Sequence, residues 1–302
     1  MTQDLPQPGA VKAYPEPDAA DVSELLLGWC GADAEDADDA VKALGALDDD
    51  ARELADRLYQ SIAADMGGKK WLSWPKVTEP HSLLGLYPLL AAVPDMLAYH
   101  RERGIDEDLS RKVLVDVGEK LRLNRRIYGR AGLDVANWFT GHVRGALYQL
   151  GRLQFCVEGP DPEPFVGMHI RGEGGPLTLD AVRDSTEWAL EFFPAVFPER
   201  YDGPEELVFK CDSWLLDPQL RDWLPERSNI PGFGALFDLE GDGGPVGNRT
   251  DLWRFVFMRT EDTPVEELPQ DNTLQRSVLA GIKADVPWRS RLGTLNLNRL
   301  GL

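Results

Sequence analysis

The sequence predicts an α+β protein in which a helical N-terminal part precedes a mixed α/β C-terminal part. The 302 residues are enough for two domains. Apolar residues recur with a helical period through the first half, whereas short apolar runs on either side of one long helical pattern mark the second half. Between the halves, residues 158–164 (EGPDPEP) combine glycine, prolines and acids, a composition typical of a domain boundary or a major turn.

In the first half, residues 1–20 are rich in proline and acids, and we expect a loose tail there. A first helix is expected to begin at an N-cap, Asp21, and to end at Gly31. Further helical patterns cover residues 48–67, 82–104, 106–132 and 135–159. A mostly helical domain is therefore predicted over residues 21–157, with a second domain over 158–302.

The second domain is expected to alternate between strands and helices. Residues 165–170 and 206–216 have the composition of buried strands, and residues 178–197 between them have a helical period. Strand, helix and strand in this order predict a parallel crossover. The remaining segments are predicted to be a hairpin around a glycine-rich loop, a helix and a partly strand-like tail, at residues 234–258, 273–285 and 288–300.

Composition restricts the class of protein. The formal net charge of −19 argues against nucleic acid as the main partner. Neither an apolar run of about 18 residues nor a secretory signal is visible, so no membrane partner is expected. Three widely spaced cysteines (Cys30, Cys156 and Cys211) fit neither a disulfide framework nor a paired-cysteine metal site. We expect a cytoplasmic protein with reduced thiols and no metal.

Charge is distributed unevenly along the chain. Residues 1–66 carry 16 acidic and 4 basic residues, whereas residues 119–152 carry 7 basic and 2 acidic residues. The basic segment can receive an anionic ligand or an acidic partner, or its arginines can pair with the acidic helices of the same chain. The sequence alone leaves both interpretations open.

A glycine-rich turn follows the first predicted strand of the second domain, in the segment FVGMHIRGEGGPLTLD (residues 165–180). Gly172, Gly174 and Gly175 allow close approach of the backbone to an anion, and Thr178 is the predicted N-cap of the next helix. Helix N-termini after such turns bind phosphate groups, and Arg171 adds a positive charge. Such turns are common without ligands, however, so the residues alone favour a plain connection.

Four longer segments together carry a resemblance to a known family: WFTGHVRGALYQLGRLQF, MHIRGEGGPLTLDAVRDSTEWALEFF, CDSWLLDPQLRDWLPERSNIPGF and LPQDNTLQRSVLAGI. The chain resembles a bacterial acyltransferase family with a helical N-acyltransferase N-terminal domain and a GNAT-like C-terminal domain. It departs from the family at Arg171, where proline is usual, and at Asp212, where histidine is frequent. The resemblance implies that the second domain is built on a GNAT-like mixed sheet.

The resemblance implies that the glycine-rich turn holds coenzyme A. In GNAT enzymes the corresponding loop binds the pyrophosphate, with the pattern Gln/Arg-x-x-Gly-x-Gly/Ala, and Arg171 to Pro176 match this pattern loosely. The implied donor is acyl-CoA or an acyl-pantetheine on a carrier protein, whose arm lies between two splayed strands. The expected cofactor-binding residues are Ile170, Arg171, Gly172, Gly174, Gly175, Leu177 and Thr178.

The implied reaction is direct attack of an amine on a thioester, in which a base removes the amine proton. His169 is the candidate base, because histidine titrates near neutral pH; its alternative is a structural hydrogen bond. Cys211 is a candidate nucleophile or a buried thiol, and Ser213 a donor to the thiolate or a strand-end contact. Asp212 is a candidate to orient His169 or bind the amine, or a surface ion-pair partner. Candidate substrate-binding residues are Trp214, Ser228 and Asn229.

Two functions from different classes follow. The first is an N-acyltransferase that acts on a small-molecule or peptide amine, with acyl-CoA or an acyl carrier protein as donor. The second is an inactive GNAT-like domain that binds an acyl or coenzyme A ligand as a sensor or partner module. Release of free thiol in the presence of an amine separates the two.

Overall fold

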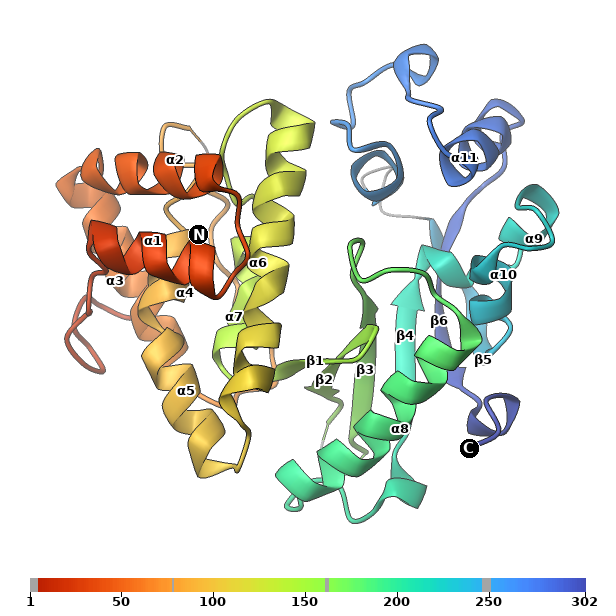
Figure 1. The fold of residues 1–302 in the computed structure, drawn as a ribbon, viewed down its shortest axis with the longest axis horizontal. Coiled ribbons are helices and arrows are strands. Elements are labelled where there is room, and N and C mark those ends of the chain that lie inside the picture. Colours follow the sequence, from red (N-terminus) through yellow and green to blue (C-terminus); the bar gives the residue numbers. More distant parts are fainter. Residues whose placement is uncertain (1–4, 78, 161–162, 246–250) are drawn as a thin grey trace. The chain divides into compact units, whose positions relative to one another are not determined.

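The computed structural model describes residues 5–77, 79–160, 163–245 and 251–302. The chain forms two compact units, Met1–Gln149 and Leu150–Leu302, shown with their element labels in Figure 1. The boundary predicted between residues 157 and 158 therefore falls within sequence that belongs to the second unit, because a strand of its sheet runs through Glu158.

Helices build the first unit, as the apolar period predicts. Aspartates cap several of them: the Asp48 side chain accepts from the Ala51 amide and the Asp106 side chain from the Leu109 amide. The first helix is capped by Asp18 rather than by Asp21, whose carboxylate instead accepts a hydrogen bond from the Asp18 amide. The helices of this unit are α1 (Ala19–Gly28), α2 (Ala34–Gly45), α3 (Asp49–Ala63), α4 (Leu86–Ala91), α5 (Val93–Glu102), α6 (Glu107–Tyr128), η1 (Ala136–Trp138) and α7 (Phe139–Val143).

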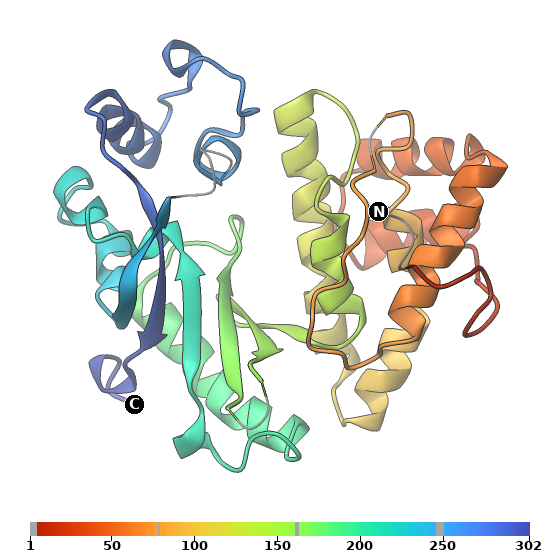
Figure 2. The same cartoon turned by 180° about the vertical axis from the view of Figure 1, so that it is seen from behind.

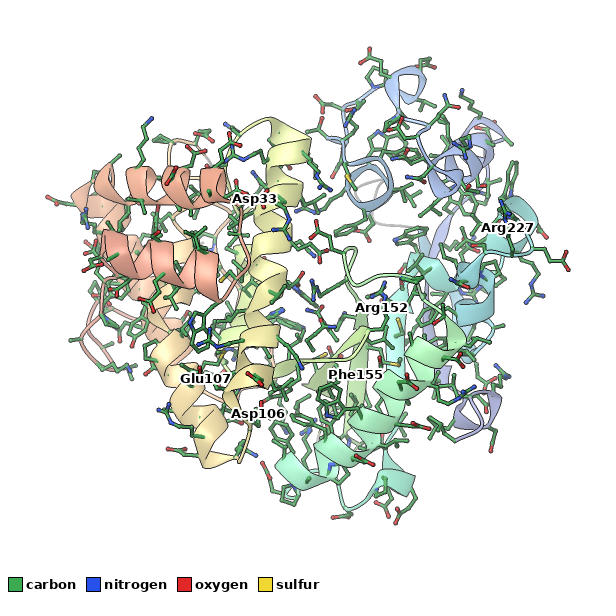
Figure 3. The ribbon with its side chains drawn as sticks, in the orientation of Figure 1. Asp33, Asp106, Glu107, Arg152, Phe155 and Arg227 are labelled. Carbon is green, nitrogen blue, oxygen red and sulfur yellow. The ribbon has the colours of Figure 1, made fainter. Side chains whose placement is uncertain are left out.

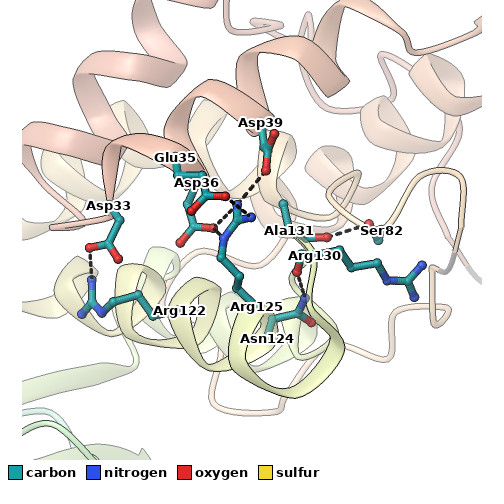
Figure 4. Close-up of polar contacts among 10 residues, drawn as sticks. All are labelled: Asp33, Glu35, Asp36, Asp39, Ser82, Arg122, Asn124, Arg125, Arg130 and Ala131. Carbon is teal, nitrogen blue, oxygen red and sulfur yellow. Dashed lines mark hydrogen bonds and ion pairs between the residues drawn. The ribbon is translucent and has the colours of Figure 1, made fainter.

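Arginines of α6 pair with acids of the same unit, as Figure 4 shows. The Arg125 guanidinium contacts carboxylates of Glu35, Asp36 and Asp39 at 2.6 to 3.0 Å, and Asp36 is buried. Arg122 donates to the Gly31 carbonyl at 2.6 Å. Arg122 and Arg125 therefore pair with groups of the same chain, which is the second of the two interpretations of the basic segment.

Residues 135–159 were expected to be helical, and this expectation is wrong for most of the segment. Helix α7 ends at Val143, and strands β1 (Leu147–Leu150) and β2 (Leu153–Glu158) follow. Gly145 and Gly151 adopt left-handed backbone conformations, with φ of 74° and 68°. Residues of this kind end helices and form tight turns, so the two glycines convert an apolar run into a hairpin.

A mixed six-stranded sheet with the order β1-β2-β3-β4-β6-β5 is the framework of the chain after α7. Strand β3 (Phe165–Ile170) lies antiparallel to β2 and parallel to β4 (Phe209–Ser213). Helix α8 (Leu179–Val196) connects β3 and β4, so the predicted strand–helix–strand arrangement with parallel strands is confirmed. Strand β6 (Arg289–Leu295) is antiparallel to both β4 and β5 (Phe237–Pro245).

The hairpin predicted over residues 234–258 is wrong. Strand β5 pairs with β6, and Leu252–Phe257 forms a π-helix instead of a returning strand; residues 246–250 of the expected loop lie outside the described residues. Trp253 and Phe257 of this segment pack into a core cluster with Leu279 and Trp288, which stabilises a helix that the strand-like composition did not indicate.

The other predicted elements of this unit are present: helix α11 (Thr273–Lys283) and the strand-like tail, which is β6. The unit also contains the short helices η2 (Pro204–Glu206), η3 (Trp214–Leu216), α9 (Leu220–Trp223), α10 (Asn229–Gly234), η6 (Val265–Glu267) and η7 (Leu297–Arg299).

Helix α8 packs against one face of the sheet. The Phe155 ring of β2, labelled in Figure 3, lies 6.4 Å from the Phe193 ring of α8 and 5.8 Å from the Phe209 ring of β4. Figure 2 shows the opposite face of the sheet toward the viewer, with α8 behind the strands. Among the described residues, none of the helices has the length and apolarity needed to cross a membrane.

Candidate active site

The sheet face opposite α8 carries His169. Because Phe155 faces α8, strand alternation directs its neighbours Gln154 and Cys156 to the other face. In the antiparallel register, His169 is paired with Gln154, and Gly167 with Cys156. The side chain of His169 is 29% exposed, so the imidazole lies at the surface of the sheet and near the carboxyl end of β3.

His169 belongs to a cluster with Glu158 and Cys156 of β2. Its Nε2 atom lies 3.7 Å from Oε1 of Glu158 and 3.2 Å from Sγ of Cys156, and Cys156 donates to Oε1 of Glu158 at 2.9 Å. Burial pushes the pKa of the Glu158 carboxyl up, but the contacts with His169 and Cys156 outweigh it and hold this pKa below its usual range. Glu158 is therefore a carboxylate at neutral pH, beside the imidazole.

Sequence reasoning did not single out Glu158 or place Cys156 in the site. Both lie in the segment that was expected to be helical, and a helix there gives no reason to place their side chains beside His169. Once β2 is recognised as a strand, the alternation of Gln154, Cys156 and Glu158 places all three on the face of His169. The alternation of residues along LQFCVE (residues 153–158) is therefore the sequence signal that could have identified Cys156 and Glu158.

The glycine-rich turn connects this strand to the N-terminus of α8. Strand β3 ends at Ile170, and the Thr178 hydroxyl accepts from the Ala181 amide at 3.2 Å as the N-cap of α8, which confirms the predicted cap. Gly175 has φ of 86°, a conformation that side chains other than glycine rarely adopt. The turn therefore lies beside the N-terminus of an 18-residue helix, the end at which the helix dipole is positive.

Arg152, labelled in Figure 3, holds this turn in place and was not identified from the sequence. Its Nε atom donates to the Gly175 carbonyl at 2.8 Å, and its backbone amide donates to Oγ of Ser185 on α8 at 2.8 Å. One residue between β1 and β2 thus connects the hairpin, the glycine-rich turn and the helix. The guanidinium also brings a positive charge to the turn.

Strands β3 and β4 are paired over a short distance only. In these two strands, which the structure describes completely, the ladder consists of Val166 with Phe209 and Gly167 with Lys210. His169 and Ile170, further along β3, have no counterpart in the ladder with β4. The two strands therefore separate toward their carboxyl ends, at the level of His169 and the glycine-rich turn.

The predicted site residues of β4 have distinct surroundings. Cys211 is buried, and burial raises the pKa of its thiol to about 12, which disfavours the thiolate that a nucleophile requires. The Ser213 hydroxyl accepts from the Leu215 amide at 3.1 Å, the strand-end contact considered above. Asp212 lies on the same sheet face as His169 by alternation, and its Oδ1 accepts from the Ser290 hydroxyl at 2.7 Å.

The predicted substrate-binding residues lie around a different part of the unit. Trp214 packs against the core cluster near Trp288, and Ser228 caps α10, of which Asn229 is the first residue. A hollow of about 190 Å³ between η3, α10 and β5 is lined by neighbouring residues. A hollow of about 240 Å³ lies in the helical unit, beside Tyr87. His169 lines neither.

Comparisons with known proteins agree with this architecture. Residues 20–145 match the model of the N-acyltransferase N-terminal domain, and residues 147–295 match that of the GNAT-like C-terminal domain. In the comparison with curated proteins, no sequence matches this chain.

Solved structures of acyltransferases are similar over nearly the whole chain. A mutant acyltransferase in complex with octanoyl-CoA is 33% identical, with a TM-score of 0.87; the similarity covers 96% of this chain and 91% of that chain. An acyltransferase in complex with decanoyl-CoA and teicoplanin has the same identity and coverage, with a TM-score of 0.86. An acyltransferase in complex with CoA and 10C-teicoplanin, also with the same identity and coverage, has a TM-score of 0.85.

The fold, the turn at the N-terminus of α8 and this similarity agree with one another. The chain belongs to the acyltransferase family that combines an N-acyltransferase N-terminal domain with a GNAT-like C-terminal domain, and it is an acyltransferase.

Proposed function

We propose that this protein transfers an acyl chain from acyl-CoA to an amine of a glycopeptide-like acceptor, by direct attack of the amine on the thioester. The observation that carries the proposal is the position of His169, whose imidazole is paired with Glu158 beside the turn that opens α8. Similar acyltransferases are in complex with octanoyl-CoA or with decanoyl-CoA and teicoplanin, which supports a medium-length acyl donor and a large polar acceptor.

The donor is bound by the turn and by the separation of the two strands. The turn of Gly172, Gly174 and Gly175 at the positive end of α8 receives the pyrophosphate, and Arg171 and Arg152 add charge. Leu177 is buried and anchors the turn, so it contributes through its backbone. The pantetheine arm extends from the turn along Ile170, into the space where β3 and β4 separate.

The acceptor reacts on the exposed sheet face. The amine nitrogen forms a bond to the thioester carbon, and its proton passes to the imidazole of His169, while Glu158 beside Nε2 stabilises the positive charge. Asp212 on the same face attracts the acceptor ammonium, which loses one proton to solvent before the neutral amine attacks. The carbon–sulfur bond then breaks, and the thiolate takes the proton from His169, which returns to its neutral form.

The direct experiment measures acceptor-dependent transfer. The full chain is supplied with acetyl-CoA, octanoyl-CoA, decanoyl-CoA or an octanoyl carrier protein, and with a glycopeptide that has a free sugar amine. Mass spectrometry of the acceptor is expected to show one added octanoyl or decanoyl group. The same glycopeptide with its amine already acetylated is the matched control.

Thiol release that does not depend on the free amine contradicts amine transfer and indicates hydrolysis. Binding of acyl-CoA with no release of thiol favours the second function above, a ligand-binding module. Equal use of the carrier-bound donor contradicts the choice of acyl-CoA. His169→Ala is expected to lower kcat/KM by about 10²-fold to 10⁴-fold, the contribution of a general base.

A further inference from the structure

The cluster that includes His169 has the composition of a metal site. Cys156, Glu158 and His169 each offer one ligand atom, and the three atoms Sγ, Oε1 and Nε2 lie within 4.8 Å of one another. The individual separations are 2.9 Å between sulfur and oxygen, 3.2 Å between sulfur and nitrogen and 3.7 Å between oxygen and nitrogen. Thiolate, imidazole and carboxylate are the ligands that zinc takes in proteins.

These separations are close to what a tetrahedral ion requires. Bonds from zinc of about 2.0 Å to nitrogen and oxygen and about 2.3 Å to sulfur place ligand atoms about 3.3–3.6 Å apart. The present atoms need to move by about half an ångström or less to meet that requirement. Three protein ligands leave the fourth position for water, as in open zinc sites.

The surrounding strands favour convergence of these side chains. Gly167 stands opposite Cys156 in the β2–β3 ladder, and a Cβ atom there would lie 2.6 Å from Sγ of Cys156 and 2.8 Å from the Glu158 carboxyl carbon. The missing side chain leaves the space in which the ligands meet. Cys156 is buried, whereas the side chains of Glu158 and His169 are 27% and 29% exposed, so an ion can enter from the open face.

We propose that Cys156, Glu158 and His169 form a binding site for Zn²⁺, and that the bound ion inhibits acyl transfer. On binding, the Cys156 thiol releases its proton to solvent and the thiolate bonds to the metal. When Nε2 of His169 is bonded to zinc, the neutral imidazole carries its proton on Nδ1, so the ring no longer accepts a proton from the amine. The inhibition rests on the function proposed above for His169; the binding of metal does not.

The contacts of Cys156 favour a metal ligand over a nucleophile. Burial and the neighbouring Glu158 charge raise the pKa of this thiol well above its usual range, so without metal it stays protonated at neutral pH. A metal dication reverses this preference, because it stabilises the thiolate directly. Binding is therefore expected to release the thiol proton.

The test uses the full chain, freed of metal by a chelator and kept reduced, and titrated with Co²⁺ as the probe. Coordination by Cys156 is expected to produce a sulfur-to-cobalt charge-transfer band in the near ultraviolet, which Zn²⁺ then removes by competition. Calorimetry with Zn²⁺ in buffers of different ionisation enthalpy is expected to report release of one proton for each ion bound.

Three variants separate this site from adventitious metal binding. Cys156→Ser is expected to abolish the charge-transfer band and to weaken Zn²⁺ binding by about 10-fold to 100-fold or more, whereas Cys30→Ser, at a buried free thiol of the other unit, leaves both unchanged. Gly167→Ala is expected to weaken binding without removing a ligand. Circular dichroism checks that each variant is folded.

No band in the wild-type chain, or an unchanged band in Cys156→Ser, overturns the site. Inhibition is followed as acylated product by mass spectrometry, because zinc also binds released thiol, and each rate is compared with the same variant's metal-free rate. The Zn²⁺ concentration that halves the transfer rate is expected to be at least about 10-fold higher for Cys156→Ser than for the wild-type chain. Metal binding without inhibition, together with an active His169→Ala, contradicts the function of His169 and leaves the metal site standing.

Discussion

The Nε2 atom of His169 lies 3.7 Å from Oε1 of Glu158, across the antiparallel pair of strands β2 and β3. This relationship predicts that Glu158→Gln impairs catalysis although the fold persists. Without the carboxylate, the imidazolium formed during reaction loses its partner, and we expect kcat/KM to fall by about 10-fold to 100-fold, less than on loss of the base itself. Steady-state kinetics with saturating acceptor measures the effect.

Glu187→Gln, at an exposed position of α8, is the matched control for removal of one carboxylate. It is expected to retain wild-type kinetics. Unchanged kinetics in Glu158→Gln would falsify the orienting role of Glu158, while an equal loss in both variants points to a general effect of charge.

Arg152 is expected to affect the binding of the donor more than the chemical step. Arg152→Ala removes the hydrogen bond to Gly175 and a positive charge from the turn, and we expect KM for acyl-CoA to rise about 10-fold with kcat nearly unchanged. Arg152→Lys keeps the charge and is expected to show a smaller rise. Isothermal titration with coenzyme A checks binding directly; equal affinity in all three proteins contradicts a role in the turn.

The ion pairs of Arg125 are expected to stabilise the fold without contributing to donor binding. Arg125→Glu leaves buried Asp36 beside a new negative charge, and we expect the free energy of unfolding to fall by about 3 kcal/mol or more. Arg126→Glu, at an exposed position of the same helix, changes the charge equally and is expected to cost far less. Urea unfolding measures both variants. A salt-dependent rise in KM for acyl-CoA in Arg125→Glu instead supports an anion site on α6.

Stability is expected to fall with acidification because of His100. This side chain is fully buried, its Nδ1 lies 2.8 Å from the Ser110 hydroxyl, and burial lowers the pKa of the imidazole to about 4 from 6.5. Because the pKa of His100 is lower in the folded than in the unfolded chain, the free energy of unfolding is highest above pH 6.5. It decreases as pH falls from 6.5 through 4, because only the unfolded chain binds the proton in this range. The loss is about 3 kcal/mol for a shift of this size.

Urea unfolding of the wild type and of His100→Phe, at pH values above 6.5 and near 4, tests this expectation. The variant is expected to lose less stability on acidification, because phenylalanine has no proton to gain. His81→Asn is the control, since the His81 side chain is partly exposed and lies near Asp48. An equally steep loss in His100→Phe assigns the pH dependence to other groups.

The sequence was informative where one local signal determined the structure. Thr178 before an amphipathic run predicted the start of α8, and the apolar runs on either side of it predicted the parallel strands β3 and β4. Prediction failed where distant pairing overrode local pattern. Residues 147–158 have an apolar spacing that also fits a helix, and only the turns at Gly145 and Gly151 and the pairing with β3 make them strands.

The same limit applies to the site. His169 was identified because its strand and its turn are adjacent in sequence. Glu158 and Arg152 come from the misassigned hairpin, so their contacts with His169 and Gly175 depend on a register that the sequence does not display. The role of His169 stays a prediction until the kinetics are measured.

The short ladder between β3 and β4 has a mechanical consequence. Two residue pairs, Val166 with Phe209 and Gly167 with Lys210, join one three-stranded ribbon of the sheet to the other. Hydrogen exchange of the amides along this seam is expected to be faster than within either ribbon, because fewer bonds must open. A pantetheine arm bound between β3 and β4, as proposed above, is expected to hold the two ribbons together and to slow this exchange. The fraction of protein with bound donor can then be measured from the exchange rate of these amides.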